Sequence, residues 1–127
     1  MEYLLEILKP EELSEIVEEN EEIKSLTKEE IKEILSFLES LKLNGKEIIQ
    51  ENPFVLTKDK KDLEDLIKTF KKYKIENIHY FIESYPNILN KSSYEIDSWM
   101  EKRKKFMEED KIIDFLENNP MVIEEEL

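Results

Sequence analysis

Apolar residues recur every three or four positions along most of this chain, the spacing that places side chains on one face of an α-helix. The clearest example lies between residues 27 and 45, where the face consists of Ile31, Ile34, Leu35, Leu38 and Leu41. Thr27 followed by Glu30 is typical of a capping box at a helix start, and Asn44-Gly45 offers a left-handed stop at its end. The pattern predicts one long helix between these two signals.

The same apolar face recurs twice further along the chain. The second copy begins near Asp59 and is displaced by 32 residues, giving Leu63, Leu66, Ile67, Phe70 and Tyr73. The third begins at Ser93 with a displacement of 33, giving Ile96, Trp99, Met100, Arg103 and Phe106. The one polar member, Arg103, is also the only arginine of the protein. We expect all three faces to be buried, with Arg103 either reaching solvent from the end of the core or pairing with a buried acid.

Four residues interrupt this pattern at nearly equal spacing, and we call them the repeat marks, or marks. They are Glu21, Pro53, Pro86 and Pro120, separated by 32, 33 and 34 residues. Apolar pairs lie four and five positions before the marks: Ile16 and Val17, Ile48 and Ile49, Phe81 and Ile82, Phe115 and Leu116. A β-branched residue lies two positions after each: Ile23, Val55, Ile88 and Val122. Because proline disfavours helix at the preceding residue, the pattern predicts a short helix before each mark and then a tight turn with a buried anchor.

The predicted unit is therefore a short helix, a turn and a longer helix in about 33 residues. Such a unit cannot bury its apolar face alone, so stacked neighbours must build the core. No segment alternates between apolar and polar residues with the period of two that marks a strand. We predict an all-α fold in which residues 1–127 form one domain, a small α-solenoid or superhelical array of about three and a half units.

One segment of the chain resembles the repeat of the mitochondrial transcription termination factor family, mTERF. The segment is LNGKEIIQENPFVL, which fits L-x-x-x-x-I-I-x-x-x-P-x-x-L through Leu43, Ile48, Ile49, Pro53 and Leu56. The second half of the pattern recurs at Phe81, Ile82, Pro86 and Leu89, and at Phe115, Leu116, Pro120 and Ile123. In these copies Glu76 and Asp110 replace the leading leucine. The resemblance covers about Leu13 to Ile123.

This resemblance implies a right-handed array of helical repeats, each with two longer helices and a short 3₁₀ turn after the proline. It also implies nucleic-acid binding, because members of the family bind nucleic acid through a basic concave surface. The present chain departs from that pattern in its acidity and its single arginine. A tetratricopeptide array is disfavoured, since that repeat requires alanine and glycine at set positions and this chain has one glycine and no alanine.

The charge of the chain is strongly negative and unevenly distributed. There are 32 acidic residues against 19 basic ones, a formal net charge of −13. Residues 1–53 carry a net charge of −9 and residues 106–127 a net charge of −7, whereas residues 54–105 carry +3. This balance opposes non-specific binding to phosphates and to anionic lipid. The acidic flanks suit a protein partner with a basic surface.

The basic middle of the chain holds the candidate partner-binding residues. Lysines on the outer face of an amphipathic helix are ordinary surface residues. However, two neighbouring long helices would bring together Lys68, Lys71, Lys72, Lys102, Arg103, Lys104 and Lys105. Tyr85, Tyr94 and Trp99 lie near them in the sequence and could form a contact surface, although aromatic residues at helical spacing more often belong to a core.

The sequence gives little support for catalysis, a cofactor or a metal site. One glycine is too few for a phosphate-binding loop, and without cysteine there is no thiolate chemistry or disulfide. We expect His79, the only histidine, to be a partly exposed helix residue rather than a catalytic base. The acidic runs lack an Asp-x-Asp-x-Asp-Gly calcium loop, so we expect them to be solvated surface. No apolar run resembles a signal peptide or a membrane span, and the cysteine-free composition favours the cytoplasm.

These observations predict a protein that recognises another macromolecule and is not an enzyme. A protein partner is favoured, with the chain acting as an inhibitor or an adaptor. Two alternatives stay open. The chain could bind nucleic acid in the manner of mTERF proteins through its basic middle, residues 54–105, or it could be a fragment of a larger protein, because it ends in half a repeat.

Overall fold

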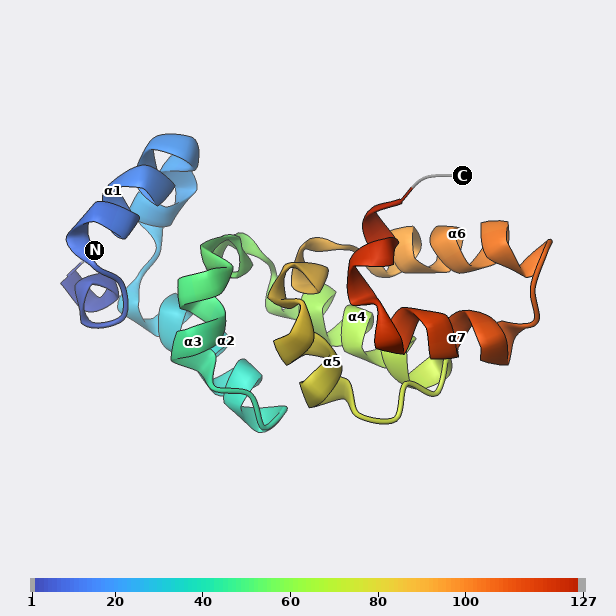
Figure 1. Ribbon diagram of the computed structural model, residues 1–127. Coiled ribbons are helices and arrows are strands. Elements are labelled where there is room, and N and C mark those ends of the chain that lie inside the picture. Colours follow the sequence, from blue (N-terminus) through green and yellow to red (C-terminus); the bar gives the residue numbers. More distant parts are fainter. Residues whose placement is uncertain (1, 126–127) are drawn as a thin grey trace. The chain divides into compact units, whose positions relative to one another are not determined.

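Every regular element of the computed structural model is a helix across the described residues, 2–125 (Figure 1). The all-α class predicted from the spacing of apolar residues is therefore confirmed. The chain divides into two compact units, residues 1–60 and residues 61–127. The symbol α denotes an α-helix and η a 3₁₀ helix.

The first unit contains three α-helices and three 3₁₀ helices among its described residues. In chain order they are η1 (Glu2–Glu6), α1 (Pro10–Glu19), η2 (Glu21–Ser25), α2 (Lys28–Ser40), α3 (Gly45–Glu51) and η3 (Pro53–Thr57). The predicted capping box opens α2. The amide of Glu30 donates to Thr27 Oγ1 at 3.1 Å, and the amide of Thr27 donates to Glu30 Oε1 at 3.0 Å.

The end of α2 differs from the prediction. The left-handed residue is Lys42, with φ of 67°, and not Gly45. The amide of Leu43 donates to the carbonyl of Leu38 at 3.2 Å, and that of Lys42 to Glu39 at 2.9 Å, which together form a Schellman motif. Gly45 instead begins α3. A Cβ atom there would lie 2.9 Å from Leu35 Cδ2, so glycine permits a close approach of α3 to α2.

The second unit contains four α-helices and two 3₁₀ helices among its described residues. They are α4 (Lys60–Lys72), whose first residue still belongs to the first unit, α5 (Ile78–Ser84), η4 (Pro86–Asn90), α6 (Ser93–Lys104), α7 (Glu109–Asn118) and η5 (Pro120–Glu124). The end of α4 repeats that of α2, with Lys74 left-handed at φ of 63° and the amide of Ile75 donating to Phe70. In contrast, α6 ends in a turn in which the amides of Phe106 and Met107 both donate to the carbonyl of Arg103.

Each of the four marks begins a five-residue 3₁₀ helix, namely η2, η3, η4 and η5. The helices that precede the three prolines end before them, as predicted, and the β-branched residue in each turn is buried. The first copy has no proline at its mark. There, Asn20 Oδ1 accepts a hydrogen bond from the amide of Glu22 at 3.2 Å, which caps the turn in the absence of proline.

Most of the predicted core is buried, but Leu41 in the first unit is only half-buried, and two phenylalanines of the second unit are exposed. Phe106 is 78% exposed, so the prediction that it is buried is wrong, and Phe115, a member of the last apolar pair, is 46% exposed. Phe106 follows the last turn of α6, where it meets no covering element among the described residues. Phe115 corresponds to Phe81, whose ring packs against Phe70. The counterpart of Phe70 is Arg103, so Phe115 lacks the equivalent aromatic partner.

Candidate functional site

The end of α4 meets α6 through an ion pair and a hydrogen bond to one carboxylate. Lys72 Nζ lies 2.6 Å from Asp97 Oδ1, and the hydroxyl of Tyr73 donates to the same oxygen at 2.5 Å. Lys104 of α6 lies over the Tyr73 ring, with Nζ 5.7 Å from the centroid. The structure therefore brings two of the predicted partner-binding residues, Lys72 and Lys104, close to one buried tyrosine.

These contacts shift the pKa values of Asp97 and Tyr73 in opposite directions. Partial burial alone would raise the pKa of Asp97, but the hydrogen bonds from Lys72 and Tyr73 and the nearby positive charges outweigh it, so its pKa is lowered. The pKa of Tyr73 is raised, mainly by burial and then by the hydrogen bond to Asp97 and the negative charge of that carboxylate. Near neutral pH the pair thus consists of a carboxylate and a neutral phenol, which is a stable structural contact rather than an acid and base poised for proton transfer.

Lys104 and Arg103 are also held by other parts of the second unit. Lys104 Nζ lies 3.2 Å from Glu101 Oε1 and 3.4 Å from Glu109 Oε1, and the hydrogen bond to Glu101 is the main reason that its pKa is raised. The Arg103 guanidinium lies 3.8 Å from the centroid of Trp99. Its terminal nitrogens donate to the carbonyls of Trp99 at 3.4 Å and Glu125 at 3.0 Å.

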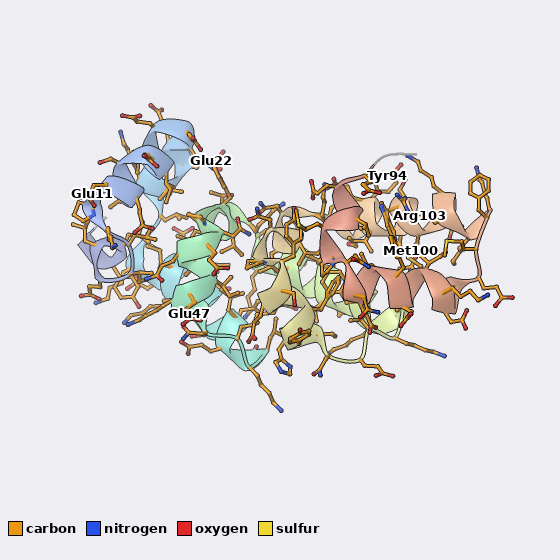
Figure 2. The ribbon with its side chains drawn as sticks, viewed as in Figure 1. Glu11, Glu22, Glu47, Tyr94, Met100 and Arg103 are labelled. Atoms are coloured by element: carbon orange, nitrogen blue, oxygen red, sulfur yellow. The ribbon has the colours of Figure 1, made fainter. Side chains whose placement is uncertain are left out.

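Of the two roles predicted for Arg103, pairing with a buried acid is wrong, since the guanidinium bonds backbone carbonyls; its side chain is half-buried beside Trp99. The indole of Trp99 completes the arrangement by donating from Nε1 to the carbonyl of Val122 at 3.1 Å. Together the two side chains tie α6 to η5. They also line a groove of about 190 Å³ between these elements, with Lys91, Tyr94 and Lys102 at its sides. Figure 2 shows Tyr94 and Arg103 on α6.

The remaining four predicted residues lie on the surface. The side chains of Lys68, Lys71, Lys102 and Lys105 are exposed and form no ion pair with another described residue. Of the three aromatic residues considered with them, Trp99 is buried, Tyr85 is half-buried and Tyr94 is 79% exposed. His79 is half-buried on α5. The seven basic residues thus divide into three that are engaged internally and four that are free for an external contact.

A second candidate surface lies in the first unit, on α1 and η2. We call it the acidic face and define it by its exposed carboxylates, Glu11, Glu15, Glu18, Glu19, Glu21 and Glu22. None of them forms an ion pair with another residue in the described part of the chain. Figure 2 shows Glu11 on α1 and Glu22 on η2. Sequence reasoning identified the charge of this segment but could not show that every carboxylate lacks a basic partner.

The other kinds of site have less support in the structure. No three potential metal ligands gather anywhere within residues 2–125. In the same range, no helix has the length and apolar character needed to cross a membrane. Comparison of the chain with protein-family models, with curated proteins and with solved structures gives no match. The candidate sites therefore rest on their own geometry: the acidic face of the first unit and the exposed lysines of the second.

Proposed function

We propose that the protein recognises a protein partner with a basic surface, without catalysis, and that the acidic face of the first unit makes the contact. One observation carries this proposal. The carboxylates of the acidic face have no basic partner among the described residues, whereas three of the seven candidate cations, Lys72, Arg103 and Lys104, are already engaged within the second unit. An inhibitor and an adaptor would both act through such a surface.

The spacing of the carboxylates supports this role. Glu11, Glu15 and Glu19 follow one another at intervals of four along α1, and Glu18 and Glu22 continue the face. Like charges at this spacing destabilise a helix by about 0.2–0.5 kcal/mol per pair. A basic partner would relieve that repulsion and would be attracted over a distance of roughly one screening length, about 8 Å at physiological salt.

Both units are acidic in total, which also favours a basic protein over a nucleic acid. Residues 1–60 carry 16 acidic and 8 basic residues, and residues 61–127 carry 16 acidic and 11 basic ones. A polyanion would meet a net charge of −8 on the first unit and −5 on the second. Its binding would depend on a local basic surface strong enough to overcome that repulsion.

The second candidate function is nucleic-acid binding by an mTERF-like repeat array, and it has its own support. Lys68, Lys71, Lys102 and Lys105 are exposed, and a 3₁₀ helix follows each of the three prolines at nearly equal spacing. These features would suit a right-handed α-solenoid of about three and a half repeats. We place this function second because three of the seven candidate cations are engaged within the second unit. Only the other four are free to contact phosphates.

A capture experiment tests the first proposal. The wild-type protein is immobilised and exposed to extract of its source cell, with and without nuclease treatment, beside a variant in which Glu15, Glu18, Glu19 and Glu22 are changed to Gln. The matched control changes Glu29, Glu39, Glu47 and Glu51 to Gln, which removes the same charge from exposed sites elsewhere in the same unit. We expect one protein to be retained by wild type and control and lost from the variant. Retention by all three, or capture that nuclease abolishes, would contradict the proposal.

A further inference from the structure

The groove between α6 and η5 has a counterpart in the first unit, and we call the two the α6–η5 groove and the α2–η3 groove. The shared positions in the α6–η5 groove are Glu95, Ser98, Trp99, Ile123 and Glu124. The same places of the repeat in the α2–η3 groove are occupied by Glu30, Glu33, Ile34, Leu56 and Thr57. Both grooves are thus built from the same positions of a long helix and of the 3₁₀ helix that closes its repeat.

In the first unit, the next long helix of the chain begins at this groove. Asp59 and Lys60, at the start of α4, also line the α2–η3 groove. The Nζ atom of Lys60 lies 3.9 Å from Oε1 of Glu33 on α2. Among the described residues, no helix begins at the same edge of the α6–η5 groove. The first unit therefore shows what a groove of this kind accepts, namely the first turn of a helix.

The two long helices of the second unit also pack side by side. Asp97 of α6 accepts hydrogen bonds from Lys72 and Tyr73 of α4. Thr69 of α4 is 7% exposed, whereas Lys102, which holds the same place on α6, is exposed. The side of α6 that carries Lys102 therefore lacks the cover that the same side of α4 has. Asp97 also shows that a helix in this position can present a carboxylate to a lysine of its neighbour.

The charges that line the α6–η5 groove define what would complement it. Lys91 lies 3.2 Å from Glu124 and 3.9 Å from Glu95, so two of the three lining carboxylates are already held. Lys102 forms no ion pair with another described residue, so a carboxylate is the group that would complement it. The glutamates of η5 suit the other feature of a helix, because its N-terminus carries a partial positive charge.

We propose that the α6–η5 groove binds an amphipathic helix of a partner protein, which begins beside η5 as α4 begins beside η3. An acidic residue in the first turns of that helix pairs with Lys102, and its apolar side covers Tyr94, which is 79% exposed (Figure 2). A helix laid in a groove is a recurring mode of recognition between proteins. One helix forms a small interface, so the expected complex is weak. This inference does not depend on the acidic face, which lies in the other unit.

Fluorescence anisotropy of a labelled peptide, titrated with the full chain, tests the proposal. The probe is a synthetic peptide of residues 59–73, the α4 sequence, with Lys60 changed to Glu, and the unchanged peptide is used for comparison. In the first unit Lys60 meets Glu33, whereas the counterpart of Glu33 in the α6–η5 groove is Ser98, one turn from Lys102. We therefore expect the acidic peptide to bind about 5-fold more tightly than the unchanged one, the upper end of the range for an exposed ion pair.

Variants of the protein locate the binding site of the peptide. Lys102→Glu should reverse the preference, so that the unchanged peptide binds more tightly. Lys71→Glu makes the same change of charge at an exposed site of α4 outside the groove and should leave the preference intact. Tyr94→Ala should weaken the binding of both peptides, whereas Tyr80→Ala, at an exposed tyrosine of α5, should not. Circular dichroism of each variant shows that it remains folded.

Three results would overturn the proposal. The first is no binding of the acidic peptide at protein concentrations up to about 1 mM, the range of weak complexes. The second is a preference between the two peptides that Lys102→Glu leaves unchanged, since the peptide would then bind elsewhere. The third is a dimer of the full chain, measured by sedimentation equilibrium, that Lys102→Glu dissociates. In that case a second copy of the chain, and not a partner helix, would occupy the groove.

Discussion

The rings of Phe70 and Phe81 meet edge to face, with their centroids 5.3 Å apart and their planes at 84°. Both side chains are fully buried, and the contact joins α4 to α5 at the centre of the second unit. The arrangement is the one that aromatic pairs prefer, and it adds about 0.5–1.5 kcal/mol to the gain from burial. The pair is thus expected to stabilise the second unit.

We predict that Phe70→Ala lowers the free energy of unfolding by about 3–5 kcal/mol, because it removes a buried ring and leaves a cavity. Urea denaturation followed by circular dichroism measures the change. Lys71→Ala, at an exposed position of the same helix, should stay within about 0.5 kcal/mol of wild type. A Phe70→Ala protein that unfolds at the wild-type urea concentration would show that this face of α4 is not the core.

Asp97 should make the stability of the protein depend on pH. Its pKa is lowered in the folded chain, so its contribution is complete above the unfolded pKa of about 3.9 and is lost as pH falls through the folded value. We predict that Asp97→Asn lowers stability at pH 7 by on the order of 1 kcal/mol, a modest effect because the side chain is 39% exposed. The difference from wild type should shrink as the pH is lowered below about 4.

Stability measured by urea titration at several pH values checks this prediction. Glu83→Gln removes one negative charge from an exposed site of α5 and serves as the charge-matched control. Tyr73→Phe should also destabilise the protein, since it removes the hydroxyl that donates to Asp97. A difference between Asp97→Asn and wild type that stays constant down to about pH 2 would mean that the charge of Asp97 does not contribute.

Arg103 should control the environment of Trp99, the only tryptophan. The guanidinium covers the indole and bonds two carbonyls, so its loss exposes the ring and loosens η5. We predict that Arg103→Ala shifts the tryptophan fluorescence to longer wavelength and lowers stability by about 1–3 kcal/mol. Arg103→Lys should restore little, because an ammonium cannot stack and form both bonds. Lys102→Ala, one residue away, should leave the emission unchanged.

The positions of the turns could be predicted because their causes are local. Proline restricts the residue before it and lacks an amide, so Pro53, Pro86 and Pro120 each fixed the place where a helix ends and a 3₁₀ helix begins. The Thr27 capping box is equally local. The left-handed residue at the end of α2 was assigned wrongly, because Gly45 is required for the packing of α3 rather than for a positive φ.

Burial and pairing could be predicted less well, because they depend on residues far apart in the chain. Phe106 follows the apolar pattern but is exposed, since burial requires a neighbour as well as a helical position. The contact between Lys72 and Asp97 joins residues 25 positions apart, which the spacing of either helix does not reveal. The candidate basic residues were identified as a group. Which of them are engaged and which are free emerged only from the packing of α4 and α6.

The central claim is that this protein recognises a protein rather than a nucleic acid, and fluorescence anisotropy tests it most directly. Labelled single-stranded and duplex oligonucleotides are titrated with the protein at low salt, where attraction to phosphates is strongest. The titration is repeated after the four exposed candidates, Lys68, Lys71, Lys102 and Lys105, are changed to Glu. We predict no binding by either protein. Micromolar binding by wild type that the four changes abolish would contradict the claim and favour an mTERF-like nucleic-acid binder.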